Sequence, residues 1–402
     1  MSEQTLSFTQ QVKAPPEEVY RAFTNVTALR EWLCDVATVS PHPGGRLYLW
    51  WTSGYYTSGS FTQAEEGKKV AFTWFGRGEP AVTQVQVNFT PQDNGTLVTL
   101  AHSGIGSGEE WSQSTVEIEK GWENSLKNLV SVLETGEDHR FVMRPMLGIM
   151  LNDFNAKIAE QLGVPVSKGI RLSGTVEGMK AGEAGLQADD IIVGMADVEI
   201  LNFDSIEKAL SGYRAGDEIE VVFFRGSEKK SVMMELSKRP LPEIPASANE
   251  LAELVKAQHQ EIETQLDEFL EGVSEEDADF KPAPDSWSLK DNLAHLIQGE
   301  RFNHIFIVEL VGGHERFADD YGGNIDAFNQ ATIATYPTIQ DLVQEYKRSM
   351  NETVQILIHI PDEFMARKGS YWRLAYNFLE QPYHFYLHLD QMKAAIGEAK
   401  KN

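Results

Sequence analysis

The chain has 402 residues, of which 42% are hydrophobic and 24% charged, as is typical of a globular protein with about two or three domains. Its formal net charge of −25 argues against nucleic acids and anionic membrane surfaces as partners, because both are bound through Lys and Arg. The N-terminus lacks a signal-peptide pattern and no segment approaches the ~20 apolar residues of a membrane span, so we expect a cytoplasmic protein. The single cysteine, Cys34, excludes an intramolecular disulfide and is expected to be a buried hydrophobe rather than a reactive thiol.

Residues 1–138 are expected to form a first domain in which strands dominate. A strand over 8–12 precedes a helix that begins at Pro15 and Pro16, since proline suits the first helical turn. Alternating apolar residues predict further strands at 46–51, 59–64, 69–75, 83–90 and 96–102, followed by a long helix at 116–133. The glycine-rich stretch 102–108 follows the last strand and is predicted to be a flexible loop, not a phosphate-binding loop.

This first domain resembles the SRPBCC superfamily, the START-like helix-grip proteins, in the branch related to the heat-shock ATPase activators. The resemblance rests on residues 14–24, 31–32, 44–46, 70–74, 95–100 and 121–122. It implies a sheet that curls around the long C-terminal helix and encloses a mainly apolar cavity for a small hydrophobic ligand. Leu33 stands where the family often has a second tryptophan, so the mouth of the cavity is expected to differ.

Aromatic side chains are dense in this domain and could line the implied cavity. The candidates in its middle strands are Trp50, Trp51, Tyr55, Tyr56, Trp74 and Phe75. The favoured lining set is Trp50, Tyr56, Trp74 and Trp122. Each of them could instead fill the core, as large aromatic side chains commonly do.

Residues 144–238 resemble a PDZ domain of the HtrA-protease type. The resemblance rests on residues 146–150, which match the carboxylate-binding loop, and on 174–192, 204–213 and 217–224. It implies a β-sandwich or barrel in which the N–H groups of Leu147, Gly148 and Ile149 hold the C-terminal carboxylate of a protein or peptide. Asp189 replaces the usual glycine, and aspartate tolerates the left-handed conformation of that turn. The alternative is a domain that serves only as a spacer or an internal docking surface.

Residues 246–402 are expected to be all-helical, after a linker stiffened by Pro240, Pro242 and Pro245. Apolar residues at helical spacing predict helices over about 251–270 and 339–358. A Ser288–Asp291 capping box predicts the start of another helix, and a fourth is expected over 371–396 with a kink at Pro382. The long connection between the second and third helices suggests a four-helix bundle.

His384 and His388 are four residues apart and therefore share one face of the last helix. His295, from the second helix, would complete a three-nitrogen site, with Asp390 or Gln391 orienting a ring. His259 is expected on the surface of the first helix.

The bundle resembles the DinB/YfiT-like proteins in residues 282–296 and 384–391. This resemblance implies that His295, His384 and His388 bind a divalent metal, and that the activity is that of a thiol transferase or a hydrolase in some members. Imidazole nitrogens favour zinc or nickel over magnesium.

The whole chain is thus expected to be a multidomain α+β protein, and two functions remain open. The first is a binding or adaptor protein that holds a small hydrophobic ligand and a peptide C-terminus beside a metal-binding bundle. The second is a metal-dependent thiol transferase or hydrolase working in the bundle. The first is favoured because two of the three domains are binding modules and no catalytic base beside the metal can be named. Neither a nucleophile elbow nor a serine triad accompanies the PDZ-like segment.

Overall fold

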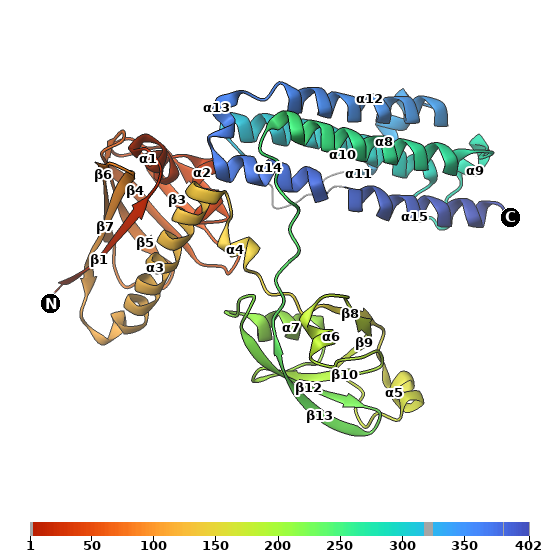
Figure 1. Cartoon of the computed structure of the whole chain (residues 1–402), viewed down its shortest axis with the longest axis horizontal. Coiled ribbons are helices and arrows are strands. Elements are labelled where there is room, and N and C mark those ends of the chain that lie inside the picture. Colours follow the sequence, from red (N-terminus) through yellow and green to blue (C-terminus); the bar gives the residue numbers. More distant parts are fainter. Residues whose placement is uncertain (1–2, 317–324, 381, 402) are drawn as a thin grey trace. The chain divides into compact units, whose positions relative to one another are not determined.

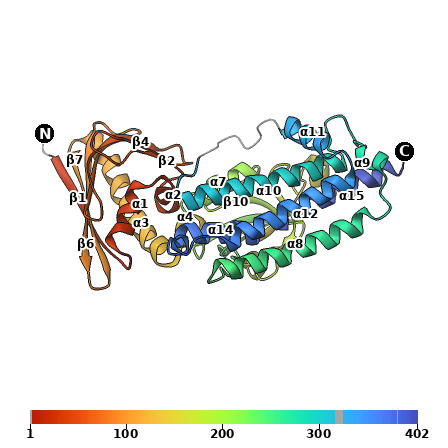
Figure 2. The same ribbon diagram turned by 90° about the horizontal axis from the view of Figure 1, so that it is seen from above.

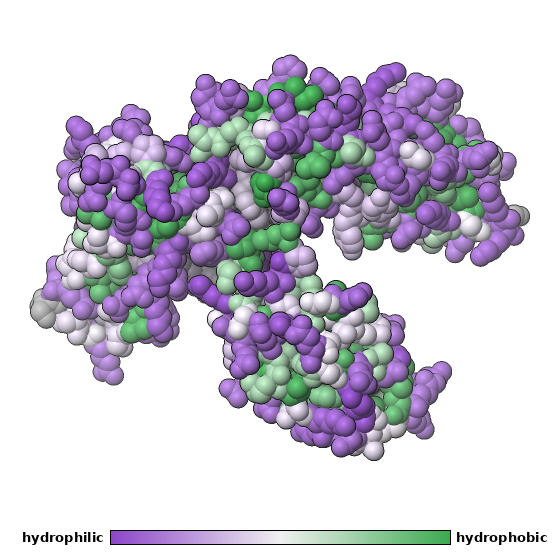
Figure 3. Space-filling view, in the orientation of Figure 1, coloured by the Kyte–Doolittle hydropathy of each residue, from purple (hydrophilic) through white to green (hydrophobic). Residues whose placement is uncertain are grey.

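The computed structural model describes residues 3–316, 325–380 and 382–401 (Figure 1). The chain divides into two compact units, one of Met1–Asp138 with Pro242–Asn402 and the other of His139–Leu241. Within the described residues, no helix combines the length and apolarity needed to cross a membrane. The visible surface is mostly hydrophilic, with hydrophobic residues in smaller areas (Figure 3), in keeping with the net charge of −25.

The N-terminal part of the first unit is a seven-stranded antiparallel sheet in the order β1-β7-β6-β5-β4-β3-β2. Its strands are β1 (Glu3–Val12), β2 (Val36–Val39), β3 (Arg46–Trp50), β4 (Tyr56–Glu65), β5 (Lys69–Gly76), β6 (Thr83–Gln92) and β7 (Gly95–Gly106). Three helices accompany the sheet: α1 (Pro16–Thr24), α2 (Val26–Trp32) and α3 (Ser112–Thr135). The long helix α3 packs along the sheet through Leu126 and Leu129, which share one core with strand residues such as Leu100. Cys34 is fully buried in this core, as expected.

The loop predicted over 102–108 is wrong for residues 103–106, because β7 continues beyond the predicted strand end at His102 to Gly106. His102 pairs with Leu6 of β1 and with Val85 of β6, so it lies inside the sheet. Burial still alternates along β7 from Gly95 to His102, which is the period of a strand. Gly104 has a positive φ of +80° near an irregularity in the β1–β7 register. A local irregularity of this kind lets β7 continue through Gly104 to Gly106.

The second unit is built on a six-stranded sheet in the order β13-β12-β10-β9-β8, with β11 paired to β10. Its strands are β8 (Ile149–Asn152), β9 (Ile170–Thr175), β10 (Ile191–Met195), β11 (Val198–Glu199), β12 (Glu218–Arg225) and β13 (Glu228–Glu235). Its helices are α4 (His139–Val142), α5 (Ala156–Leu162), α6 (Lys180–Glu183) and α7 (Phe203–Leu210). Leu172, Ile192 and Val221 belong to its core, and β8 is an edge strand that pairs only with β9 among the described strands.

The C-terminal part of the first unit is helical, and its long helices run side by side (Figure 2). They are α8 (Ala248–Leu270), α10 (Leu289–Gly312), α12 (Ile339–Ile358), α14 (Lys368–Glu380) and α15 (Pro382–Ala399). Shorter helices are α9 (Glu275–Asp279), α11 (Ile325–Thr335) and α13 (Asp362–Met365). The fourth helix expected over 371–396 corresponds to α14 and α15, and Gln381 between them lies outside the described residues, so the expected kink at Pro382 stays a prediction.

His259 is buried, not on the surface as expected, with only 7% of its area exposed. It lies on the same face of α8 as Val255, Ile262 and Leu266, at the spacing of one helical stripe. Burial lowers the pKa of His259 to about 4, so the ring is neutral in the folded protein near pH 7.

Within the first unit, polar contacts join the N-terminal part up to Asp138, which we call the helix-grip part, to the helical part that follows Pro242. Helix α14 packs against α2 and α3. Glu315 lies 2.7 Å from the guanidinium of Arg373 and 3.4 Å from that of Arg30. The hydroxyl of Ser370 donates to the buried carboxyl group of Glu31. These contacts explain why two segments far apart in the sequence form one compact unit.

Candidate functional site

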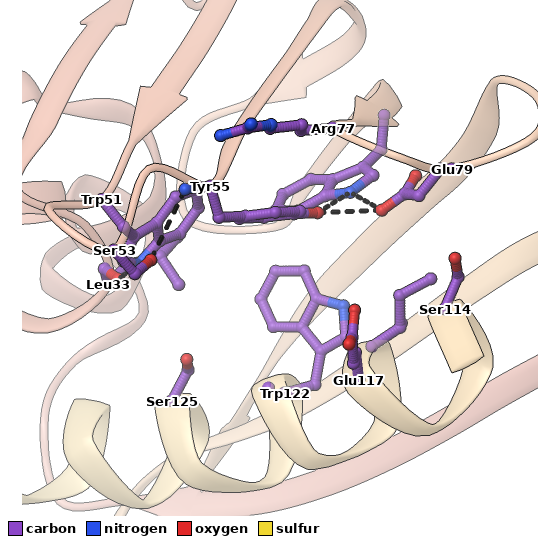
Figure 4. A pocket seen from close by; sticks show the side chains of 13 residues that line it. Leu33, Trp51, Ser53, Tyr55, Arg77, Glu79, Ser114, Glu117, Trp122 and Ser125 are labelled. Carbon is purple, nitrogen blue, oxygen red and sulfur yellow. Dashed lines mark hydrogen bonds between the residues drawn. The ribbon is translucent and has the colours of Figure 1, made fainter. Parts of the chain in front are cut away.

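A cavity of about 300 Å³ lies between α3 and the strands of the helix-grip part (Figure 4). Side chains of Trp122 and Glu117 rise from α3 toward Tyr55 and Glu79 on the opposite wall. The residues that line the cavity are Leu33, Trp51, Ser53, Tyr55, Trp74, Arg77, Glu79, Ser114, Glu117, Ile118, Gly121, Trp122 and Ser125. The volume is at the lower end of the range for ligand sites, so a small molecule fits it best.

Two of the four favoured lining residues, Trp74 and Trp122, line this cavity, but Trp50 and Tyr56 do not. Trp50 pairs with Tyr56 across β3 and β4, and Tyr56 is 41% exposed. Their neighbours Trp51 and Tyr55 line the cavity in their place. The correction is a shift of one residue past the end of β3 and before the start of β4, and successive side chains along extended backbone point to opposite sides.

Glu79 is the most buried charged group of the lining, with 7% of its area exposed. Its Oε1 accepts hydrogen bonds from the hydroxyl of Tyr55 at 2.8 Å and from Nε1 of Trp74 at 3.0 Å. Its Oε2 accepts from the backbone N–H of Gly76 at 2.9 Å. Burial and the adjacent carboxylate raise the pKa of Tyr55 well above its usual value, so the phenol stays protonated and donates.

His102, predicted as the last residue of the strand over 96–102 and the first of the glycine-rich loop, lies within β7 and supports the cavity wall through Trp122. Nε1 of Trp122 donates to Nδ1 of His102 at 3.1 Å, and Nε2 of His102 lies 2.7 Å from Oγ1 of Thr83. Because the indole is only a donor, Nδ1 is the acceptor and Nε2 carries the proton. Burial lowers the pKa of His102 to about 4, which keeps this neutral tautomer near pH 7. The alternation of β7 was the sequence signal for this inward position.

The three histidines predicted as metal ligands lie together at one end of the bundle. Nε2 of His384 is 3.3 Å from Nε2 of His295 and 3.0 Å from Nε2 of His388. One ring nitrogen from each residue lies within 4.8 Å of the others. His295 comes from α10, and the other two come from successive turns of α15. His388 is buried, His295 is half-buried and His384 is exposed.

Neighbouring groups fix the ring of His388. Its Nδ1 faces Oδ1 of Asn292 at 2.9 Å and Oε1 of Gln391 at 3.0 Å. Both are acceptors, so Nδ1 carries the proton and the lone pair of Nε2 points at the cluster. Trp287 stacks on the ring, with centroids 5.9 Å apart. Of the two groups expected to orient a ring, Gln391 contacts His388, whereas Asp390 is exposed.

The protonation of the cluster fits a metal ligand set. Burial lowers the pKa of His295 and of His388 to about 4, with neighbouring histidines adding repulsion between charged rings. Partial burial of its ring also lowers the pKa of His384. Neutral imidazoles bind metals, and ligands ~2.0–2.1 Å from a tetrahedral zinc are roughly 3.3 Å apart. The two separations from Nε2 of His384, 3.0 and 3.3 Å, are close to that spacing, and the three ring nitrogens all lie within 4.8 Å of one another.

A hollow of about 570 Å³ opens beside the histidine cluster. His388 and Trp287 form part of its wall. The other residues that line it are Pro282, Asp285, Ser286, Asn292, Gln391, Ala394, Ala395 and Glu398. A small molecule in this hollow would therefore reach the edge of the cluster.

In the second unit, Leu147, Gly148 and Ile149 lie just before and at the start of the edge strand β8. Gly148 has a φ of +71°, and a Cβ there would lie 2.4 Å from Cβ of Met179, so the turn requires glycine. The carbonyl of Gly148 accepts from the N–H of Val176 at 2.8 Å. The sheet order leaves the outer edge of β8 without a strand partner in the described part of the unit.

Two family models match separate parts of the chain. Residues 13–134 match the model described as Activator of Hsp90 ATPase homolog 1-like protein. Residues 258–392 match the model of the DinB superfamily.

Curated relatives are serine proteases of the HtrA type. HtrA of Lactococcus lactis is 25% identical over 149 residues, and a probable periplasmic protease of Haemophilus influenzae is 33% identical over 114 residues. These alignments span 36% and 28% of this chain, and 36% and 24% of the relatives.

Solved structures with similar parts include an HSP90 activator from Plasmodium falciparum, which is 26% identical with a TM-score of 0.29 and covers 32% of this chain and 95% of that one. A protein from Chromobacterium violaceum is likewise 26% identical, with a TM-score of 0.28 and the same coverage of both chains. On the two family-model matches, the chain carries a domain like the Hsp90 ATPase activators at residues 13–134 and a DinB-like region at residues 258–392.

Proposed function

We propose that this protein is a cytoplasmic binding protein that takes a small, mainly apolar ligand into its helix-grip cavity. The observation that carries this proposal is the cavity of about 300 Å³ lined by Trp51, Tyr55, Trp74 and Trp122. A peptide C-terminus in the second unit and a divalent transition metal in the bundle complete the proposal.

The ligand site can be tested with an uncharged solvatochromic dye such as Nile red. Gly121 lines the cavity from α3, and a Cβ added there meets no atom within 4 Å. Gly121→Leu should therefore fill the cavity without a clash and abolish saturable dye binding. Gly397→Leu, at an exposed position of α15 with equally open surroundings, is the matched control and should bind as wild type does. Equal dye binding by both variants would reject the cavity as the site.

The metal site is supported by the spacing of the three Nε2 atoms and by the tautomer of His388. His295, His384 and His388 would hold zinc or nickel. Elemental analysis of the purified protein after reconstitution should give about one equivalent of metal. His388→Ala should lose it, and the exposed His359→Ala of the same bundle should not. Less than a tenth of an equivalent in the wild type would exclude this site.

The peptide site is supported by the free edge of β8 and by the turn at Gly148, whose φ of +71° requires glycine. A peptide would add as a strand beside β8, with its carboxylate at the N–H groups of Leu147, Gly148 and Ile149. In a library of C-terminal peptides, the acid form of a bound peptide should bind more tightly than its amide, because amidation removes the charge that the N–H groups meet. Equal affinities of the two forms would rule this mode out.

A second candidate function is a metal-dependent thiol transferase or hydrolase, favoured by the hollow of about 570 Å³ beside His388. A divalent metal would supply Lewis acidity there and would lower the pKa of a thiol. The chain would supply the stacked wall of Trp287 and the carboxylate of Asp285, an acceptor on the rim of the hollow. Turnover of 1-chloro-2,4-dinitrobenzene with glutathione that His388→Ala abolishes would support the enzyme. Turnover that survives in His388→Ala would count against it.

A further inference from the structure

Glu79 is a buried carboxylate that faces the helix-grip cavity without a cationic partner. It is 7% exposed and lines the cavity. Within the described parts of the chain, no Lys, Arg or His nitrogen forms an ion pair with it, in contrast to the buried Glu315. A buried charge without a counter-charge is costly, because the protein interior screens it less than water does.

The groups that contact the carboxylate of Glu79 all donate hydrogen bonds to it. Tyr55, Trp74 and the N–H of Gly76 all donate to its two oxygens, and none of these donors carries a charge. Three donated hydrogen bonds suit an ionised carboxylate, which only accepts. The network therefore holds the negative charge in place and leaves it electrically unbalanced at the cavity wall.

Aromatic rings form the walls beside this carboxylate. The ring centroids of Trp51 and Tyr55 are 5.2 Å apart, those of Trp51 and Trp74 are 6.4 Å apart, and those of Trp74 and Trp122 are 5.5 Å apart. The face of an aromatic ring attracts a cation, and tryptophan does so most strongly. Rings that enclose a carboxylate favour a positively charged, alkylated group over a neutral one.

Charged residues at the rim do not neutralise the negative charge of Glu79. Glu117 is exposed on α3 and adds a second negative charge to the lining. Arg77 is also exposed, and its Nη1 donates to the carbonyl oxygen of Gly54 at 2.8 Å. Figure 4 shows Arg77 on the far side of Tyr55 from Trp122. The lining thus has two carboxylates and one guanidinium, and its buried charge is negative.

We propose that the ligand of this cavity is an organic cation, an apolar molecule bearing an amino or quaternary ammonium group, whose charge is held by Glu79 among Trp51, Tyr55, Trp74 and Trp122. This inference rests on the proposed ligand-binding function and narrows the ligand from hydrophobic molecules in general to amphiphilic amines. A neutral molecule of the same shape would fill the space and leave the carboxylate unbalanced.

The test compares two probes of the same shape in the full-length protein. Benzyltrimethylammonium is a cation, and neopentylbenzene replaces its nitrogen with carbon. Each is titrated by calorimetry and by displacement of Nile red. The cation should bind at least ten-fold more tightly than the hydrocarbon to the wild type. Glu79→Gln should reduce that preference at least ten-fold while the affinity for neopentylbenzene changes less than three-fold.

Two control variants distinguish the effect of the buried charge of Glu79 from that of exposed charges on α3. Glu123→Gln removes an exposed charge of α3 outside the lining and should keep the preference. Glu117→Gln, at the rim, should reduce it less than Glu79→Gln does. If Glu79→Gln does not fold, the comparison of the two probes in the wild type still decides.

The outcomes distinguish this inference from the function on which it rests. Equal or tighter binding of neopentylbenzene overturns the inference and leaves a ligand site for neutral molecules. Nile red that binds but is displaced by neither probe also overturns it. Absence of saturable binding by the dye and by both probes overturns the ligand-binding function itself.

Discussion

Asp189 holds a backbone conformation that usually requires glycine. Its φ is +68°, in the left-handed region. Arg171 donates to its carboxylate at 2.6 Å, but the side chain of Asp189 is 53% exposed, so the ion pair adds little stability. The sequence-based expectation that aspartate tolerates this conformation is confirmed.

We therefore expect Asp189→Ala to destabilise the second unit by about 1 kcal/mol and Asp189→Gly to be neutral or slightly stabilising, because only glycine adopts a positive φ without a Cβ clash. All tryptophans of the chain lie outside this unit, so their fluorescence does not report on its unfolding. Hydrogen exchange of the amides in β9 and β10 of the full-length protein measures the effect. Slower exchange in the alanine variant than in the glycine variant would contradict the strain argument.

His102 couples the stability of the helix-grip part to pH. Its pKa is about 4 in the folded protein, below the ordinary value of 6.5, because the ring is buried. As pH falls below 6.5, His102 binds a proton in the unfolded chain but not in the folded chain. The free energy of unfolding therefore decreases progressively down to about pH 4. Between pH 7 and pH 5 this one group should cost about 2 kcal/mol.

His102→Gln should therefore make the urea midpoint, followed by tryptophan fluorescence, less dependent on pH over that interval. The exposed His42→Gln is the control and should keep the wild-type dependence. Buried His259 and the cluster histidines titrate in the same direction, so only the difference between variants measures His102. An identical pH dependence in His102→Gln and wild type would contradict this assignment.

Local sequence motifs predicted elements best where short-range contacts define them. The side chain of Ser288 accepts from the N–H of Asp291 at 3.1 Å, and the carboxylate of Asp291 accepts from the N–H of Ser288 at 3.0 Å. These two hydrogen bonds confirm the capping box at the start of α10. The start of the helix in turn fixes the position of His295 along α10. The i, i+4 spacing of His384 and His388 on a helix is equally local.

Elements whose partners are distant could not be predicted as well. The residues that line the cavity depend on the β3–β4 register and on the backbone between the strands, which moved the lining by one residue, from Trp50 to Trp51. Glu79 follows β5 outside any strand, and only the folded sheet brings it to Tyr55, 24 residues earlier. No spacing in the sequence pointed to this pair.

Because the three histidines come from two helices, a metal should tie α10 to α15. A metal that binds only the folded state stabilises it by mass action, by about 2.7 kcal/mol at a concentration of 100 Kd. Adding zinc to the metal-free protein should therefore raise the melting temperature by several degrees, and a chelator should reverse the change. Adding zinc should leave the melting temperature of the His295→Ala variant unchanged. A shift of equal size in that variant would show that zinc binds elsewhere.

At the scale of the whole molecule, Glu315 lies at the centre of the polar contacts at the junction inside the first unit. It is buried and accepts two hydrogen bonds from Arg373 at 2.7 and 2.8 Å, with Arg30 at 3.4 Å. Burial alone would raise its pKa, but Arg373 and Arg30 more than offset this, so the pKa of Glu315 is lowered. Thr27 and Arg373 lie far from Glu315 in the sequence, which is why no sequence pattern predicted the junction.

Replacing Glu315 with Gln would remove the carboxylate that accepts two hydrogen bonds from Arg373 and lies 3.4 Å from Arg30. Breaking one side of a buried pair costs about 3 kcal/mol or more, since the remaining charge stays desolvated. We expect Glu315→Gln to lower the free energy of unfolding of the first unit by about that amount in urea, followed by tryptophan fluorescence. Glu309→Gln removes the partner of Arg316, whose side chain is 79% exposed, and should cost less than about 1 kcal/mol. Equal losses in the two variants would mean that Glu315 contributes no more than a surface ion pair, and that apolar packing of α14 on α2 and α3 holds the junction.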